Sequence, residues 1–188
     1  MQRLITALAM AALSFAGFPA HADEYSDTVA TFKKAGESAN FFDDSYGYAV
    51  FPTIGKGGLG VGAAHGKGRV YEQGKYVGDA SMTQVSVGLQ AGGQAYSQII
   101  FFADKRAFDE FTSGNFEFAA GVSAVAITAG VSGTTGTTGS SAGASGGKND
   151  AGTRGKYHKG MAVFTVAKGG LMYEASLGGQ KYKYKARS

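Results

Sequence analysis

The chain has 188 residues, a length that predicts one domain with a single sizeable core. It contains no cysteine, so the fold must stand without disulfide bonds, and any metal site would depend on its histidines and carboxylates. Its 18 basic and 14 acidic side chains give a formal charge of only +4, which permits an anionic partner without requiring one.

Residues 1–22 have the pattern of a secretory signal peptide. Arg3 supplies a positive start, residues 4–18 are apolar, and Ala20-His21-Ala22 forms a small-residue cleavage site. The apolar run is too short to span a bilayer comfortably. We therefore expect the mature chain to begin at Asp23 and to be periplasmic or secreted.

The mature chain is predicted to open with a helix over residues 23–40. Tyr25, Val29 and Phe32 recur at helical spacing, and Asp23 or Ser26 is placed to cap the first turn. We interpret this helix as one that packs on a sheet with its lysines in water. A membrane-seeking helix is the alternative.

One sequence pattern occurs twice, at residues 49–59 and 162–171. In each copy a short apolar run meets Lys-Gly-Gly, with Lys56 in the first copy and Lys168 in the second, and another apolar run follows. Glycine adopts positive φ without steric cost, so each copy predicts a β-hairpin with its turn at the glycines. The two lysines are then expected to lie close in space.

Strands are predicted through most of the remaining chain. Residues 81–91 alternate most clearly, with Val85, Val87, Leu89 and Ala91 on one face and polar residues or glycine on the other, as in a half-buried strand. Asp104 is expected to cap a short helix over residues 105–112, and residues 132–156, rich in Gly, Ser and Thr, are expected to form a flexible insert. The other predicted strands are 46–51, 59–63, 69–72, 97–102, 116–118, 122–131, 161–167, 171–177 and 181–185, with a turn at 73–75.

These elements predict an α+β fold. The sheet is expected to be mostly antiparallel and curved into a sandwich or barrel, with an N-terminal helix and one short internal helix. The 31 glycines and 23 Phe and Tyr residues, against two prolines, favour β-structure with tight turns over a helical bundle.

No catalytic, nucleotide or metal motif is complete. Residues 62–68 lack the spacing and the Ser or Thr of a phosphate-binding loop, and Gly58, Gly60 and Gly62 lack the helix of a dinucleotide site. His65 and His158 are the histidines beyond residue 22, and we interpret both as surface or turn residues. We expect no cofactor, no nucleotide and no nucleic acid partner. A hydrolase that uses His65 is the weakest alternative.

A set of basic residues near the glycine turns is the candidate binding site. Several lysines that converge on an anionic membrane surface contribute about 1 kcal/mol each. The alternative is that these lysines only keep sheet edges from pairing with other chains. The candidates are Lys56, Lys67, Arg69, Lys168, Lys181 and Lys183.

The order of the motifs resembles the SYLF domain. The resemblance is carried by residues 46–52 (YGYAVFP), 56–62 (KGGLGVG), 66–71 (GKGRVY), 94–102 and 169–171, and it covers nearly all of residues 23–188. It implies an anionic lipid or a membrane surface as the partner, phosphoinositides in eukaryotic members, and actin in some of them. Export makes actin an unexpected partner here.

We therefore expect one SYLF-like domain over residues 23–188 that is exported, non-enzymatic and recognises anionic phospholipid head groups. The alternative is a structural or stress-related envelope protein with no specific small ligand.

Overall fold

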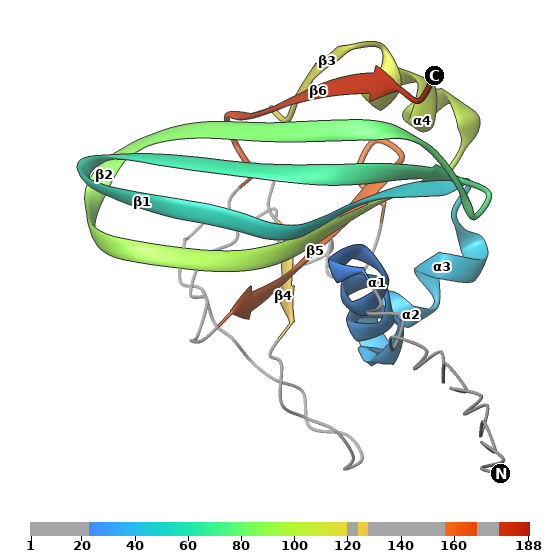
Figure 1. Ribbon diagram of the computed structural model, residues 1–188, viewed down its shortest axis with the longest axis horizontal. Coiled ribbons are helices and arrows are strands. Elements are labelled where there is room, and N and C mark those ends of the chain that lie inside the picture. The colour runs from blue at the N-terminus through green and yellow to red at the C-terminus, as the bar shows by residue number, and fades with distance from the viewer. Residues whose placement is uncertain (1–22, 120–123, 128–156, 169–176) are drawn as a thin grey trace, which may run out of the picture.

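The computed structural model describes residues 23–119, 124–127, 157–168 and 177–188, without the side chains of residues 59 and 86–92. The predicted signal peptide (1–22) and insert (132–156) lie outside this part of the chain, as do Gly169 and Gly170 of the second repeat. The elements, labelled in Figure 1, are α1 (Glu24–Lys34), α2 (Gly36–Ala39), α3 (Phe41–Asp44), β1 (Gly47–Glu72), β2 (Lys75–Phe102), α4 (Lys105–Thr112), β3 (Asn115–Glu117), β4 (Val125–Ile127), β5 (Met161–Lys168) and β6 (Gln180–Ala186).

Two very long strands dominate the fold. β1 and β2 pair antiparallel along almost their whole lengths, from Gly47 opposite Phe102 to Glu72 opposite Lys75. Gln73 and Gly74 connect them with φ of 47° and 79°, the positive values that a two-residue hairpin loop requires. The predicted turn at residues 73–75 is confirmed, and we call this paired unit the β1–β2 ribbon.

The ribbon is folded over on itself (Figure 1), so that the two halves of β1 pack closely against each other. A Cβ atom added at Gly66 would lie 2.6 Å from Cγ1 of Ile54, and one at Gly68 would lie 2.6 Å from the Phe51 ring. At the fold, Gly60 has a φ of 73°. Only glycine allows such a bend together with such close contact.

The hairpin predicted at Lys56-Gly57-Gly58 is therefore wrong. Both halves of β1 have β2 as their hydrogen-bonded partner, and these residues lie within β1 as it approaches the fold. The strands predicted separately at 46–51, 59–63 and 69–72 are parts of this one strand. The ribbon as a whole reverses near these glycines, where the register between β1 and β2 shifts between residues 59 and 61.

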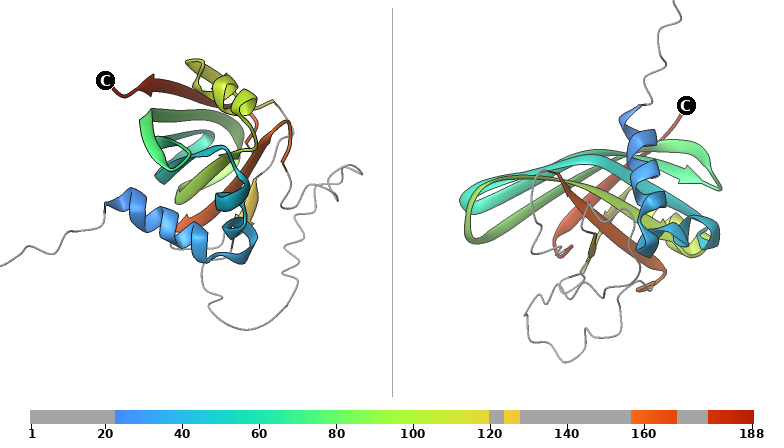
Figure 2. Two further views of the ribbon diagram at one scale, coloured as in Figure 1. Left: turned by 90° about the vertical axis from the view of Figure 1, so that its right-hand side faces the viewer. Right: turned by 90° about the horizontal axis from the view of Figure 1, so that it is seen from below.

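Shorter strands complete the sheet along the edge of β2 that β1 does not occupy. Its order is β3-β6-β2-β5-β4, with β1 also paired to β2, and the β4–β5 pair alone is parallel among the pairs in the described residues. β6 lies along the first half of β2 and β5 along the second half. The sheet curls without closing (Figure 2), which confirms the predicted mostly antiparallel α+β fold.

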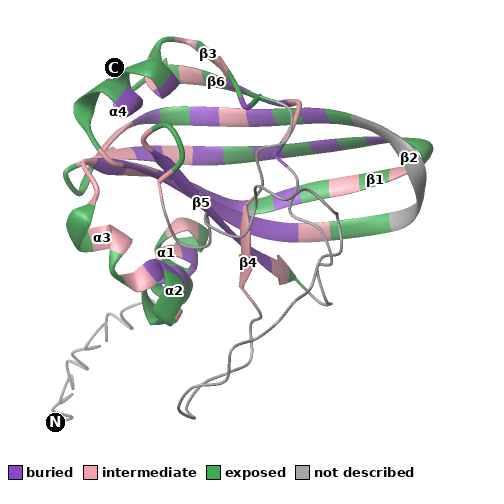
Figure 3. Cartoon of the chain, turned by 180° about the vertical axis from the view of Figure 1, so that it is seen from behind, coloured by how far each residue is buried: buried purple, intermediate pink, exposed green. Residues whose placement is uncertain are grey.

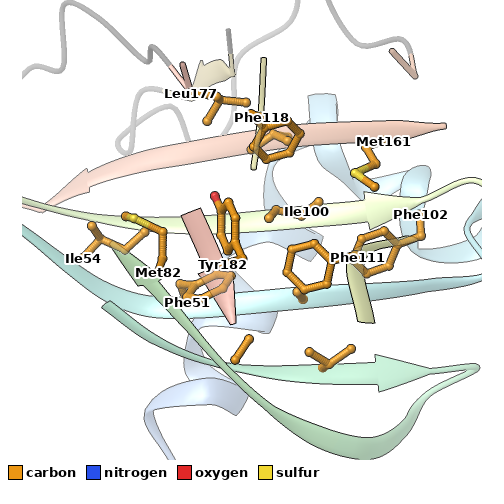
Figure 4. Packing of buried hydrophobic residues seen from close by; sticks show 14 of the residues in the cluster. Phe51, Ile54, Met82, Ile100, Phe102, Phe111, Phe118, Met161, Leu177 and Tyr182 are labelled. Carbon is orange, nitrogen blue, oxygen red and sulfur yellow. The ribbon is translucent and has the colours of Figure 1, made fainter. Parts of the chain in front are cut away.

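Apolar side chains pack on two faces of this sheet. Inside the fold, Phe51, Phe111 and Tyr182 belong to one buried cluster (Figure 4), to which α4 contributes Phe108 and Phe111. On the outer face, Phe32 of α1 packs with Val50, Phe101 and Phe164 in a second cluster beneath α1 and α3. The predicted role of the N-terminal helix, packing on the sheet, is confirmed.

The N-terminal helix differs from its predicted length. Asp23 caps α1 by accepting a hydrogen bond from the Ser26 N–H at 2.9 Å, as expected. The helix stops at Ala35, which has an extended backbone with ψ of 115°, and two four-residue helices follow in place of a continuous helix to Asn40. No helix within the described ranges is long and apolar enough to cross a membrane.

The interior contains a network of buried glutamines and tyrosines. Gln98 Nε2 donates to the Tyr182 hydroxyl at 2.6 Å and to Gln180 Oε1 at 3.3 Å, and Tyr182 donates in turn to Gln180. Gln180 Nε2 donates to the Tyr96 hydroxyl at 3.3 Å and to Gln84 at 3.5 Å. Burial raises the pKa of Tyr96 to about 12 and that of Tyr182 well above its usual value.

This network reverses the usual alternation of a half-buried strand in β2. Gln84 is only 8% exposed and points into the core, whereas the neighbouring Val85 is 71% exposed. In a half-buried strand the apolar face is the one expected inside. The valine side of this segment, which the alternation predicted to be the buried side, is therefore exposed at Val85. Buried and exposed residues alternate along much of the long strands (Figure 3).

Candidate functional site

One outer face of the sheet carries a cluster of basic side chains, which we call the basic face. It spans the second half of β1, the first half of β2, and β6, on the opposite side of these strands from the buried Gln84 and Tyr182. Because alternate residues of a strand share a face, every second residue of β1 and β6 contributes to it. Its members are Lys67, Arg69, Lys181, Lys183 and Lys185.

Strand register places these side chains in rows across the three strands. Residues directly opposite each other in an antiparallel pair project from the same face, and neighbouring strands lie about 4.8 Å apart. Lys67 and Lys183 are therefore about 10 Å apart at their backbones, with the Ser81 hydroxyl between them. The rows are Lys67–Ser81–Lys183 and Arg69–Asp79–Lys185.

A surface pocket of ≈ 410 Å³ lies on the basic face. Two ammonium groups on either side of a hydroxyl can donate hydrogen bonds to the oxygens of a phosphate. The row Lys67–Ser81–Lys183 therefore suits a phosphate group. Tyr25 of α1 forms part of the wall. The lining residues are Tyr25, Lys67, Gly68, Asp79, Ala80, Ser81, Lys183, Tyr184 and Lys185.

Arg69 is engaged with α1. Its guanidinium forms an ion pair with Asp23 and lies 4.0 Å from the centre of the Tyr25 ring. The Ser26 N–H and then the Arg69 guanidinium hold the pKa of Asp23 below its usual value. Arg69 thus fastens the start of α1 beside the pocket, which makes it a positioning residue for the pocket wall.

Carboxylates compensate some of the other charges. Lys181 Nζ lies 3.7 Å from Glu117 of β3, and Asp79 accepts a hydrogen bond from the Tyr76 hydroxyl at 2.6 Å. Within the described part of the chain, Lys67, Lys183 and Lys185 form no ion pair. These three lysines are the charges left available to a ligand.

Lys56 and Lys168 do not join the basic face pocket. They lie two strands apart, and the register pairs Lys56 with Gln94 but Lys168 with Ala95, so their side chains leave opposite faces of the sheet. Lys168 Nζ donates to Thr53 Oγ1 at 2.6 Å and to Glu24 Oε1 at 3.3 Å, so it fastens α1. The expectation that these two lysines form one shared site has no support in this arrangement.

The structure brings part of the candidate set to the pocket. Of the six candidates, Lys67 and Lys183 line the pocket, and Arg69 and Lys181 lie beside it. Lys185, which continues the alternation of Lys181 and Lys183 along β6, also lines the pocket. Ser81, Asp79 and Tyr25 carried no local signal, because only strand pairing and helix docking bring them to the lysines.

His65 on β1 and His158 just before β5 are exposed, as predicted. In the ranges that the structure describes, no group of three or more His, Asp or Glu side chains is arranged to hold a metal ion.

Comparisons with known proteins identify a family and a relative. Residues 83–187 match the Ysc84 family, described as "Las17-binding protein actin regulator". The chain is also 30% identical over 158 residues to Beta cell expansion factor A from Aeromonas veronii. That match includes 82% of this chain and 51% of the relative, so the chain spans about half the length of the curated relative it matches.

Proposed function

Because this chain belongs to the SYLF (Ysc84) family, whose domains are known for lipid binding or actin regulation, we propose that it binds anionic phospholipid head groups through its basic face. The family is not a known enzyme family, and we propose a non-enzymatic role for this chain. The lipid phosphate sits between Lys67 and Lys183, with Ser81 as a further donor and Lys185 at the neighbouring row.

The observation that carries this proposal is the row Lys67–Ser81–Lys183 at a pocket whose three lysines form no ion pair among the described residues, although the Asp79 carboxylate also lines the pocket. Each lysine held near an anionic membrane surface contributes about 1 kcal/mol. Three such lysines contribute about 3 kcal/mol, which corresponds to about 100-fold in membrane partitioning.

The position of Lys183 favours ligand binding over edge protection, whereas Lys67 in β1 and Lys185 beyond the β3 pairing lie along edges that have no further strand partner in the described residues. Lysines that prevent aggregation are needed on the outermost strand of a sheet. Lys183 lies in β6, which has β2 on one side and β3 on the other, and its partner in β3 is Asn115. Lys183 therefore does not lie on an outer edge of the sheet, where a lysine would be needed to prevent pairing with another chain.

Vesicle co-sedimentation tests the proposal. Purified protein is mixed with vesicles of phosphatidylglycerol and phosphatidylcholine at equal amounts, and separately with vesicles of phosphatidylcholine alone. We expect binding to the anionic vesicles that weakens as salt increases, because salt screens exposed charges. Equal binding to both kinds of vesicle would contradict the charge mechanism.

A matched pair of variants locates the site. The triple variant Lys67→Gln, Lys183→Gln, Lys185→Gln is expected to lose about 100-fold in binding. The control removes the same charge from exposed lysines outside the pocket: Lys34→Gln, Lys105→Gln and Lys159→Gln. Equal losses in both triple variants would show that net charge, and no particular face, determines binding.

Export is a second part of the proposal. It is supported by the signal-peptide pattern of residues 1–22, with cleavage after Ala22. An exported chain meets the lipids of the bacterial envelope and does not meet actin. N-terminal sequencing of protein recovered from the envelope fraction is expected to start at Asp23, and a start at Met1 would refute export by this route.

A further inference from the structure

The folded end of the β1–β2 ribbon presents an apolar patch, which we call the valine tip. Among the side chains that the structure describes, Val61 and Val85 are the two large hydrophobic ones left exposed, at 61% and 71%. Ala63 lies directly opposite Val85 and is also exposed, and Val61 is opposite residue 87. Val61 and Val85 are therefore diagonal neighbours, about 7–8 Å apart.

The valine tip lies far from the helices. In Figure 1 the folded end of the ribbon extends to one side, while α1, α2, α3 and α4 all gather toward the other. Single exposed apolar residues are common on protein surfaces. Here two valines and an alanine are contiguous. In the same part of β2 the polar Gln84 is buried, while its apolar neighbour Val85 is exposed.

The valine tip is continuous with the basic face. Along β1 the outward residues run Ala63, His65, Lys67, and along β2 they run Val85, Thr83, Ser81. Four residues of strand separate the tip from the row of Lys67 and Ser81, a distance of about 13 Å. One face of the ribbon therefore changes from apolar to basic over that distance.

This order matches the layers of an anionic bilayer. Amphipathic segments bury their apolar side about 5–10 Å into the boundary between head groups and acyl chains. A strand inclined at about 30–45° to the membrane lowers the tip by about 7–9 Å relative to the lysine row, given its 13 Å length. The valines then reach the acyl boundary while the lysines stay at the phosphates.

We propose that the valine tip inserts into the interface of an anionic bilayer when the basic face binds lipid phosphates. This inference rests on the proposed function and adds the orientation of the protein on the membrane. Face-to-face packing of two copies is disfavoured, because it places the Lys67 and Lys183 side chains of one basic face against those of the other.

A single fluorescent label tests insertion. The chain has no cysteine, so Val85→Cys accepts one environment-sensitive dye at the tip. Glu37→Cys, an exposed position on α2, is the control. With vesicles of phosphatidylglycerol and phosphatidylcholine, we expect a blue shift and stronger emission at the tip and no change at the control. A tip label that stays unshifted on bound protein overturns insertion.

Substitutions at the tip give an independent measure. Val61→Ser and Val85→Ser keep the net charge and alter exposed side chains, and each is expected to weaken vesicle binding about fivefold, with about 25-fold for both. Val61→Leu with Val85→Leu is expected to strengthen it. The difference between variants should persist at high salt, because burial of apolar surface is not screened.

The outcomes separate the two proposals. Absence of wild-type binding to anionic vesicles refutes the proposed function itself. Binding that depends on the three lysines but is identical in the serine variants overturns insertion and leaves lipid binding in place. A serine variant that changes the oligomeric state in solution, with unchanged vesicle binding, also overturns insertion, because the tip is then a contact between copies.

Discussion

The buried hydroxyl of Tyr182 connects the two glutamines at the centre of the fold. Tyr182→Phe removes this oxygen and keeps the ring, which packs against Phe51, Phe111 and Phe118. The substitution deletes the bond accepted from Gln98 Nε2 at 2.6 Å and the bond donated to Gln180. Gln98 then keeps only its longer bond to Gln180 at 3.3 Å, whereas Gln180 also keeps its bonds to Tyr96 and Gln84.

The expected cost follows from these contacts. A buried hydrogen bond contributes about 1 kcal/mol net, so two lost bonds predict a decrease of about 2 kcal/mol in unfolding free energy. For a domain of this size that lowers the melting temperature by about 4–8 °C. Differential scanning calorimetry measures it, with Tyr184→Phe as the control, whose half-buried hydroxyl makes one 3.1 Å bond to Val77 O and should cost less.

A melting temperature for Tyr182→Phe equal to that of the wild type would refute this reasoning. It would mean that the two glutamines reorganise and satisfy each other without the tyrosine. The interior would then impose no polar order on the strands, and the outward position of Val85 would need another cause.

Three further predictions concern the ribbon, α1 and the interior. Gly68→Ala places a Cβ 2.6 Å from the Phe51 ring, so chemical denaturation should show a loss of about 1–3 kcal/mol in unfolding free energy. Gly55→Ala, whose added Cβ would meet no atom within 4 Å, should leave the unfolding free energy nearly unchanged. Hydrogen bonds, led for Asp23 by the Ser26 N–H and for Glu24 by Thr53, lower the pKa of both carboxyls from 3.8 and 4.5. The two carboxylates contribute their full stability above pH 3.8 and 4.5, and this contribution is lost as the pH falls through their folded-state pKa values. The double variant Asp23→Asn, Glu24→Gln should therefore lose less unfolding free energy on acidification than the wild type. An equal loss in both proteins would contradict this. Burial raises the pKa of Tyr96 from 10 to about 12, so its stabilisation is complete below pH 10 and is lost toward pH 12, and ultraviolet titration should show late ionisation; ionisation near pH 10 in folded protein would contradict its burial.

Local patterns in the sequence predicted the elements well. The helix cap at Asp104, the buried side of α4, and the separation of Tyr182 from Lys181 and Lys183 are all as expected. Each depends on periodicity within a few residues, which a linear pattern contains. The existence of a mostly antiparallel sheet follows from the same information.

Long-range pairing decided what local pattern could not. The first Lys-Gly-Gly predicted a hairpin because a turn and a fold in a paired ribbon require the same glycines, and only the partner strand β2 distinguishes them. Lys56 and Lys168 share a motif, yet a difference of one residue in register sends them to opposite faces.

The basic face was set by the tertiary structure in the same way. The sequence determined that alternate lysines of β6 are exposed and that Lys67 lies between two glycines. It did not determine that Ser81 lies between Lys67 and Lys183, because that depends on the pairing of β2 with both β1 and β6. It did not determine the valine tip either, since Gln84 faces inward only where Gln180 and the backbone carbonyl of Gly178 are present to bond it.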